Sequence, residues 1–368
     1  MTRLLQKAET GAPLPRDEIA ALLAAKTPAD CAALHGAAYR VKLRGVGGVV
    51  RLRGLVEASN ICARNCLYCG IRANNAQCAR YQLSRDEILG LAALAETFRY
   101  GSIVIQAGER REAAWVDFIT DVVRAVKAQS RGRLGVTLSL GEQAPEAYRQ
   151  WFDAGAHRYL LRVETASPAL YAAIHPAGYD WRERVACLGH LAATGYQVGT
   201  GVMCGLPGQT LDDLADDLVF FRDREIHMIG MGPWLPHANT PLGAAHPRVD
   251  AAASLRLGLN MIAVARLLMP DANIAATTAL QALAPDGRER GLLAGANVIM
   301  PNLGVPARRA DYALYDNKPG LDENAASARA DLEAAIHGIG ETIVWDAWGD
   351  PPRFAARSPK HGKRGATA

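Results

Sequence analysis

The stretch SNICARNCLYCG, residues 59–70, places three cysteines within eight positions: Cys62, Cys66 and Cys69. Their spacing is C-x3-C-x2-C, and the β-type run Val50–Glu57 directly precedes them, so the sequence predicts a loop at the end of a strand. Three sulfurs this close together indicate a common partner. With seven cysteines and no secretory signal, the chain favours metal or redox chemistry over a disulfide framework.

Two kinds of partner fit the cysteine spacing. A structural zinc site takes four protein ligands, and Cys78, nine residues after Cys69, is available as a fourth. A cubane 4Fe–4S cluster has four irons, each of which takes one external ligand, so three cysteines leave one iron open. An open iron can bind a small molecule, much as a three-ligand zinc binds water. The cluster is the favoured interpretation, and the zinc site stays open.

The rest of the chain alternates short β-type runs with longer amphipathic runs, which predicts parallel strands joined by helices. Nearly every polar or glycine-rich signature directly follows a strand, as QAGE (106–109) and SLGE (139–142) do. This distribution favours an α/β fold of the (β/α)8 TIM-barrel type, because an open sheet would gather its signatures near one switch point. The expected strands are Val50–Glu57, Ser102–Gln106, Gly135–Ser139, Arg158–Arg162, Gln197–Met203, Met228–Gly232, Asn273–Ala276 and Asn297–Met300.

Helix-end signals support this alternation. Ser84 with Glu87, and Thr210 with Asp213, have the spacing of capping boxes, and Gly195 stands where a helix should end. We expect three parts: a helical extension over 1–45, the barrel over 46–350 and a disordered basic tail over 351–368.

The composition is that of a soluble globular enzyme, with 49% apolar and 21% charged residues. The formal charge is +4, but residues 351–368 hold five basic side chains and no acidic one, which leaves 36 basic against 37 acidic residues elsewhere. A near-neutral body argues against a nucleic-acid surface. The N-terminus lacks an apolar signal core, and no uncharged apolar run reaches membrane-spanning length. We therefore expect a cytoplasmic protein with no membrane partner.

Charged residues stand at the end of the fourth expected strand. LLRVETA (160–166) places Arg162 and Glu164 two residues apart, so both side chains point to the same face. Charges that point into a barrel need partners, and Arg184, early in the next helix, can neutralise a carboxylate. A structural salt-bridge network is the alternative.

Small hydroxyl residues stand at other strand ends, in TLSLGE (137–142) and NIAATTALQ (273–281). These hydroxyls can bind a polar ligand or only their local backbone. In ADYALYD (310–316), Tyr312 and Tyr315 either close the mouth of a cavity or simply pack. The candidate substrate-binding residues are Thr137, Ser139, Arg162, Thr277, Thr278 and Tyr312.

With Tyr68 before its last cysteine, the triplet resembles the signature loop of the radical S-adenosylmethionine (radical SAM) superfamily. The resemblance implies a 4Fe–4S cluster on Cys62, Cys66 and Cys69, which binds SAM at its open iron and cleaves it to a 5′-deoxyadenosyl radical. QAGE resembles the segment at the SAM amino group, RVET the segment at the ribose, and GVMCGLPGQT (201–210) the segment beside adenine. The cofactor-binding residues so implied are Tyr68, Gln106, Gly108, Glu109, Glu164, Arg184 and Gly205.

The resemblance extends, in order, over about residues 45–317 to the HydE family of FeFe-hydrogenase maturases. It is carried by segments such as SNICARNCLYCGIRANN, RYLLRVETASPALY and MIGMGPWLPHANTPL. It implies radical chemistry on a cysteine-bound iron carbonyl/cyanide complex during assembly of the hydrogenase diiron subcluster. The implied partners are this small-molecule or iron-complex substrate, a reductant of flavodoxin or ferredoxin type, and other hydrogenase maturation proteins.

Three features depart from the family pattern. The last cysteine is Cys204, so the accessory cluster that some members carry near the C-terminus has no ligands here. Val163 stands where members often have histidine, and Ala107 where they have serine. The change at Val163 leaves open a divergent enzyme with another substrate. The main alternative among the enzymes is a methylornithine synthase-like mutase. A non-catalytic iron–sulfur or zinc-binding protein is the alternative from another class.

Overall fold

The computed structural model describes residues 1–321 and 324–357. Its main sheet is all parallel, in the order β10-β1-β2-β3-β4-β5-β7-β9. A parallel bridge between Ala275 and Val298 joins the chain after β9 to β10 and closes the ring. The predicted (β/α)8 barrel is therefore confirmed. The described strands are β1 (Val49–Ser59), β2 (Ser102–Ala107), β3 (Gly135–Ser139), β4 (Arg158–Leu160), β5 (Gln197–Thr200), β6 (Met203–Cys204), β7 (Met228–Ile229), β8 (Gly232–Pro233), β9 (Asn273–Ile274), β10 (Val298–Ile299) and β11 (Thr342–Val344).

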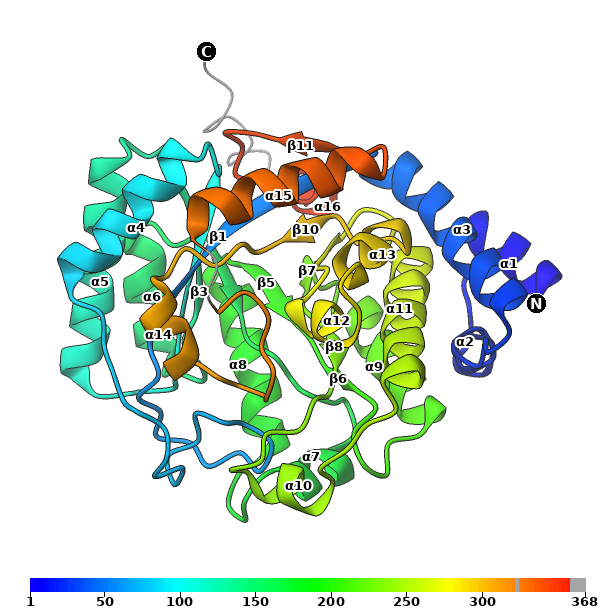
Figure 1. Ribbon diagram of the computed structural model, residues 1–368, viewed down its shortest axis with the longest axis horizontal. Helices are drawn as coiled ribbons and strands as arrows, with labels where there is room; N and C mark the ends of the chain where they lie inside the picture. The colour runs from blue at the N-terminus through cyan, green and yellow to red at the C-terminus, as the bar shows by residue number, and fades with distance from the viewer. Residues whose placement is uncertain (322–323, 358–368) are drawn as a thin grey trace.

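Helices surround the strands on the outside of the barrel (Figure 1). They begin where the sequence predicts: Ser84 and Glu87 form a capping box at α4, and Thr210 and Asp213 form one at α9. Gly195 ends α8 in the left-handed conformation that favours glycine. The described helices are α1 (Thr2–Glu9), α2 (Arg16–Leu23), α3 (Pro28–Gly45), α4 (Arg85–Thr97), α5 (Ala113–Gln129), α6 (Pro145–Ala154), α7 (Pro168–Ile174), α8 (Trp181–Thr194), α9 (Leu211–Asp223), α10 (Pro241–Ala245), α11 (Ala251–Leu268), α12 (Thr278–Leu283), α13 (Gly287–Leu293), α14 (Pro306–Asp311), α15 (Ala325–Gly338) and α16 (Pro352–Arg357).

Two of the expected strands are broken in the structure. The expected strand 197–203 divides into β5 and β6, and the expected strand 228–232 into β7 and β8, with β6 and β8 paired separately. Gly201 and Gly230 lie at the two breaks, where their backbones approach so closely that a Cβ on Gly201 would collide with the Gly230 carbonyl. This close approach bends both strands at the same level, because only glycine leaves room for it.

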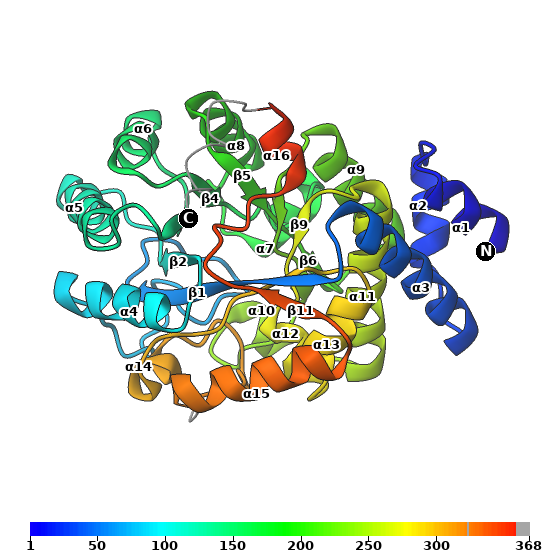
Figure 2. The same cartoon turned by 90° about the horizontal axis from the view of Figure 1, so that it is seen from above.

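The N-terminal extension consists of α1, α2 and α3, which lie together to one side of the barrel in both views (Figures 1 and 2). Asn260, buried on α11, fastens it: its amide donates to the carbonyls of Leu23 and Ala25, and its Oδ1 lies 2.9 Å from His35 Nε2. Helix α11 is long and apolar enough to cross a membrane by length and composition alone. However, 61% of its residues are buried against the rest of the fold, as in a core helix.

The C-terminal segment closes the end of the barrel at which the strands begin. Strand β11 pairs with the start of β1, and the chain then crosses this end of the barrel, in front of the strands in Figure 2. The fully buried Arg158 donates to the Trp348 carbonyl and to Asp350, both at 2.7 Å, and Arg53 Nη2 donates to the Gly349 carbonyl at 3.2 Å. The segment thus supplies acceptors for two arginines inside the barrel.

The expectation of a disordered tail from residue 351 is wrong for its first part. Residues 352–357 form α16, and Arg353 forms an ion pair with Asp271 at 2.7 Å. Basic composition suggested a solvated tail, but this arginine has an acidic partner from a distant part of the chain. Residues 358–368 of the predicted tail lie outside the described residues.

Candidate functional site

The three cysteines line a cavity of about 400 Å³ at the carboxyl ends of the barrel strands. This volume is within the range of small-molecule and cofactor sites. Burial raises the pKa of all three thiols, that of Cys66 to about 12. Free thiols at this place would stay protonated, whereas bound metal would stabilise the thiolate form.

Backbone hydrogen bonds fix the cysteine loop on three sides. The amides of Ala63, Leu67 and Gly70 donate to the carbonyls of Glu109, Ile174 and Leu314, at 2.8, 3.0 and 3.0 Å. Two glycines permit this close packing. A Cβ on Gly108 would collide with the backbone of the loop at Ile61, and one on Gly70 would collide with the Ala313 carbonyl. The loop is therefore held in place without a ligand.

A stack of aromatic rings supports Tyr68 within the loop. The His175 ring lies 3.9 Å from the Tyr171 ring, centroid to centroid, and meets the Tyr68 ring edge-on at 5.5 Å. His175 Nδ1 lies 2.8 Å from the Tyr171 carbonyl and Nε2 lies 3.5 Å from the Tyr68 hydroxyl. Burial lowers the pKa of His175 to about 4, so at neutral pH the ring is uncharged and Nε2 accepts.

Two carboxylates and three arginines form a network beside the cysteines. Glu142 Oε1 accepts from Arg184 at 2.5 Å, and its Oε2 accepts from Arg64 at 3.0 Å and from Arg111 at 2.7 Å. Although burial raises the pKa of Glu142, these arginines, Arg184 first, bring it below its ordinary value. Burial and the neighbouring Glu142 carboxylate raise the pKa of Glu109. The network therefore holds one firmly ionised carboxylate and one that binds a proton more readily.

Arg162 and Glu164 both line the cavity, as their two-residue spacing predicts. Arg162 donates to Glu164 Oε2 from Nε at 3.1 Å and to the Val202 carbonyl from Nη2 at 3.0 Å. Glu164 has a φ of 67°, a left-handed conformation that costs a residue other than glycine about 1–3 kcal/mol. Such strain is typical of functional sites, where the surrounding structure imposes it.

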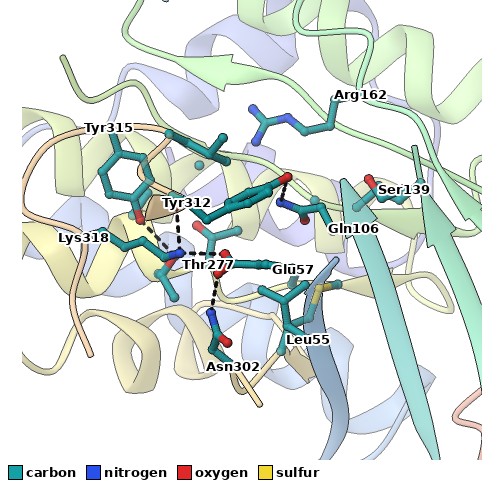
Figure 3. A pocket seen from close by; sticks show the side chains of 18 of the residues that line it. Leu55, Glu57, Gln106, Ser139, Arg162, Thr277, Asn302, Tyr312, Tyr315 and Lys318 are labelled. Carbon is teal, nitrogen blue, oxygen red and sulfur yellow. Dashed lines mark hydrogen bonds and ion pairs between the residues drawn. The ribbon is translucent and has the colours of Figure 1, made fainter. Parts of the chain in front are cut away.

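A second group of polar residues lines the cavity around Glu57 and was missed by the sequence analysis (Figure 3). Lys318 Nζ lies 2.6 Å from Glu57 Oε1, and Asn302 Nδ2 donates to Oε2 at 2.9 Å. Lys318 also donates to the Tyr312 carbonyl at 3.0 Å, while the Tyr312 hydroxyl accepts from Gln106 at 3.1 Å. A signal was present in the sequence, because Glu57 is an acidic residue inside an expected strand.

The structure brings most of the candidate residues together around the cavity. Thr278 and Tyr315 meet through their hydroxyls at 2.9 Å, so Tyr315 belongs to the wall. The candidate residues that line the cavity are Cys62, Cys66, Tyr68, Cys69, Gln106, Gly108, Glu109, Ser139, Arg162, Glu164, Arg184, Thr277, Thr278 and Tyr312.

Two candidate residues do not line the cavity. Thr137 lies two residues deeper than Ser139 on β3, and its hydroxyl accepts from Arg158 Nε at 3.0 Å. Gly205 is exposed, and its amide donates to Gln209 Oε1 at 2.7 Å within the turn before α9. Thr137 therefore provides a hydrogen-bond acceptor for the buried Arg158, and Gly205 forms part of the turn before α9.

The departure at Val163 lies away from the cavity. Its side chain is fully buried in the hydrophobic core and is absent from the cavity wall, while its amide donates to the Thr200 hydroxyl at 3.0 Å. Ala107, by contrast, lines the cavity. The histidine-to-valine difference therefore changes the core behind the wall.

The donor set fits a 4Fe–4S cluster better than a zinc ion. Cys78 does not line the cavity, and its Sγ accepts from Asn60 Nδ2 at 3.5 Å. In residues 1–321 and 324–357, no three His, Cys, Asp or Glu side chains converge where one metal ion could bind. A cluster spreads its thiolates over separate irons, so three cysteines without a fourth protein ligand can hold it.

Comparison with known proteins agrees with this chemistry. Residues 56–221 match the family model of the radical SAM superfamily. The chain is 43% identical to the [FeFe] hydrogenase maturase subunit HydE of Thermotoga maritima over 78% of this chain and 79% of that protein. It is 26% identical to a biotin synthase of a Picosynechococcus species over 80% of each chain.

Two solved structures share the fold. Methylornithine synthase (PylB) superposes with a TM-score of 0.79 at 21% identity, covering 93% of this chain and 98% of that one. The FeFe-hydrogenase maturase HydG from Carboxydothermus hydrogenoformans superposes with a TM-score of 0.74 at 18% identity, covering 94% and 79%. At this identity the likeness shows the barrel alone. From the family match and the 43% identity, the chain is a radical SAM enzyme and belongs to the HydE family.

Proposed function

We propose that this protein is a SAM-dependent hydrogenase maturase of the HydE type, acting on a cysteine-bound iron carbonyl/cyanide complex. The observation that carries the proposal is the cavity itself. Three half-buried cysteines and a second polar group at Glu57 line the same cavity, in a chain 43% identical to a HydE subunit. Space for a cofactor and a small substrate side by side is what such a reaction requires.

The residues divide into those for the cofactors and those for the substrate. Cys62, Cys66 and Cys69 would hold a 4Fe–4S cluster, and that cluster, when bound, would supply the electron for reductive cleavage of SAM to a 5′-deoxyadenosyl radical. Glu109 meets the SAM amino group, Glu164 the ribose hydroxyls and Arg184 the carboxylate. Gly108 keeps the cysteine loop close, and Tyr68 and Gln106 complete this part of the wall.

The substrate lies against the wall formed by Ser139, Arg162, Thr277, Thr278 and Tyr312. Arg162 supplies a positive charge beside the cofactor residues, which suits a carboxylate or an anionic metal complex. The hydroxyls of Thr278 and Tyr315 bind each other and can turn to a polar ligand. Segment 312–320 also contributes to the wall of the cavity, and Lys318 ties the segment to Glu57.

The cellular setting follows from this function. We propose a cytoplasmic enzyme that receives electrons from a flavodoxin or ferredoxin and works with other hydrogenase maturation proteins. No nucleic acid or membrane takes part in this scheme.

Anaerobic reconstitution tests the proposal, with Cys66→Ser and Cys78→Ser as matched variants. We expect about four irons per chain and reductant-dependent 5′-deoxyadenosine formation for the wild type and Cys78→Ser, and the loss of both for Cys66→Ser. Stoichiometric zinc without a nucleoside product would contradict the radical chemistry.

Complementation of a strain that lacks its own HydE tests the substrate. Restored hydrogenase activity supports the maturase function. Nucleoside formation without restored hydrogenase would instead indicate a HydE relative with another substrate.

A further inference from the structure

The left-handed backbone of Glu164 is held from behind the barrel wall as well as from within the cavity. On the cavity side, only Arg162 is bonded to the Glu164 carboxylate among the described residues. Behind the wall, the next two residues, Thr165 and Ala166, turn outward toward α9. The backbone of Glu164 is also bonded to the neighbouring segment, since its amide donates to the Gly201 carbonyl at 3.0 Å and its carbonyl accepts from the Met203 amide at 3.1 Å. The turn at Thr165 and Ala166 fixes the chain on the other side of the strained φ.

Asp217 on α9 holds this turn. Its Oδ1 accepts from the Ala166 amide at 2.5 Å and from the Thr165 hydroxyl at 3.4 Å. The Thr165 hydroxyl in turn accepts from the Ser167 amide at 3.1 Å, at the N-cap of α7. The carboxyl group is therefore the centre of a small hydrogen-bonded turn, and that turn begins at Glu164.

Burying the Asp217 carboxyl group costs folding free energy, because one of its oxygens is not hydrogen-bonded within the described part of the chain. The residue is fully buried, and its Oδ2 has no hydrogen-bond partner within residues 1–321 and 324–357. The charged groups that act on its carboxyl are Asp213 and Asp216, and it acts in turn on the Cys204 thiol. A leucine would remove the unpaired oxygen but would leave the Ala166 amide and the Thr165 hydroxyl without their acceptor, so the carboxyl group serves this turn rather than the packing of α9.

We propose that Asp217 is a positioning residue for Glu164, and through it for the ribose of SAM. This inference rests on the proposed function, which assigns the ribose contact to Glu164. Asp217 does not touch the cavity and acts only by holding the Thr165–Ala166 turn. The left-handed conformation of Glu164 then persists when SAM is absent, so that the carboxylate is in place before the cofactor binds.

The test is the dissociation constant of SAM for cluster-loaded protein without reductant, measured by anaerobic calorimetry together with the melting temperature. Asp217→Ala removes the acceptor and should weaken SAM binding about tenfold. Asp217→Asn keeps an acceptor oxygen and should stay within about threefold of the wild type. Asp216→Ala is the matched control, because Asp216 is on the same helix and pairs with Arg16 at the surface. Weaker SAM binding in Asp217→Ala that Asp217→Asn restores supports the positioning role.

A lower melting temperature for Asp217→Ala with unchanged SAM affinity would overturn the proposal and leave a structural role. If Asp217→Ala does not fold, Thr165→Val provides the second test. It removes the hydroxyl that Asp217 accepts from, and about threefold weaker SAM binding is expected. Unchanged affinity in that variant would also overturn the proposal.

A double-substitution cycle with Glu164→Gln separates this inference from the proposed function. If Asp217 acts through Glu164, Asp217→Ala should weaken SAM binding much less when Glu164→Gln is already present. Additive losses contradict the positioning role. If Glu164→Gln alone leaves SAM affinity unchanged, the ribose assignment within the proposed function fails instead.

Discussion

Lys318 Nζ lies 2.6 Å from Glu57 Oε1, which joins the irregular segment after α14 to the first barrel strand inside the cavity (Figure 3). Both side chains are nearly buried, and Asn302 occupies the second carboxylate oxygen. The segment after α14 is thus attached to strand β1 inside the cavity by an ion pair.

Lys318→Met should lower the free energy of unfolding by roughly 3–5 kcal/mol at pH 8, because it leaves the Glu57 carboxylate buried without its cation. Burial already raises the pKa of Glu57, so the carboxyl group can take up a proton as the pH falls. The loss should therefore shrink at pH 5. Urea denaturation followed by circular dichroism at the two pH values measures it. Glu57→Gln combined with Lys318→Met should recover most of the stability, and an equal loss in the double variant would show that the charge is not the cause.

Gly108→Ala should reduce the iron bound on reconstitution by at least half while leaving the barrel folded. The new Cβ would collide with the Ile61 backbone and with the Cys62 side chain, so the cysteine loop must move. Iron content and absorbance of the reconstituted protein measure the effect. Gly90→Ala is the matched control, because a Cβ at Gly90 meets no atom within 4 Å. Normal iron content in Gly108→Ala would mean that the loop tolerates the shift.

Asp217→Asn should stabilise the fold increasingly from about pH 4 to pH 8. Burial raises the pKa of Asp217 from 3.8 to about 8, so within this range the folded state holds a proton that the unfolded state has released. Wild-type stability therefore falls as the pH rises, by up to about 1.4 kcal/mol per pH unit. Asparagine does not titrate and avoids this loss.

Denaturation of both proteins at pH 5 and pH 8 tests the sign of this dependence. A stability difference between the variant and the wild type that does not change with pH would show that Asp217 is ionised throughout. Asp213 and Asp216, also on α9, stay unchanged in both proteins and serve as the common background.

Val163→His should cost about 1–3 kcal/mol of stability and leave SAM cleavage intact. The side chain is buried in the core rather than in the cavity, so an imidazole there is overpacked and lacks a polar partner. Thermal denaturation and the yield of 5′-deoxyadenosine measure the two effects. A changed product yield with unchanged stability would place residue 163 in the catalytic machinery.

The barrel and its rim could be predicted from sequence because their signals are local. Each signal is formed by residues only a few positions apart in the chain. This is true of the cysteine spacing, of the capping boxes at α4 and α9, and of the polar residues that follow each strand. Arg162 and Glu164 could be placed on one face because side chains alternate along a strand.

Other features depend on partners that are far apart in the chain. Lys318 contacts Glu57, and Arg184 contacts Glu142, only because the folded barrel brings these distant parts of the chain together. Thr137 and Ser139 share a face by the same alternation, but the barrel interior is layered, and only the upper of the two reaches the cavity. Spacing along a strand predicts the face of a residue and not its depth.

Gly205 and Val163 show a further limit of resemblance. Both stand in segments that match the family, yet neither contacts the cavity. A motif identifies the segment that approaches a cofactor, and the backbone then selects which of its residues do so.

The pairing of β11 with β1 has a consequence for how the protein is made. Strand β1 can pair with β11 only after residues 342–344 have been made. The segment that accepts hydrogen bonds from the two interior arginines follows those residues. The end of the barrel at which the strands begin therefore stays incomplete until residues 342–350 have been made. A chain that stops before residue 348 would leave Arg158 and Arg53 without these acceptors.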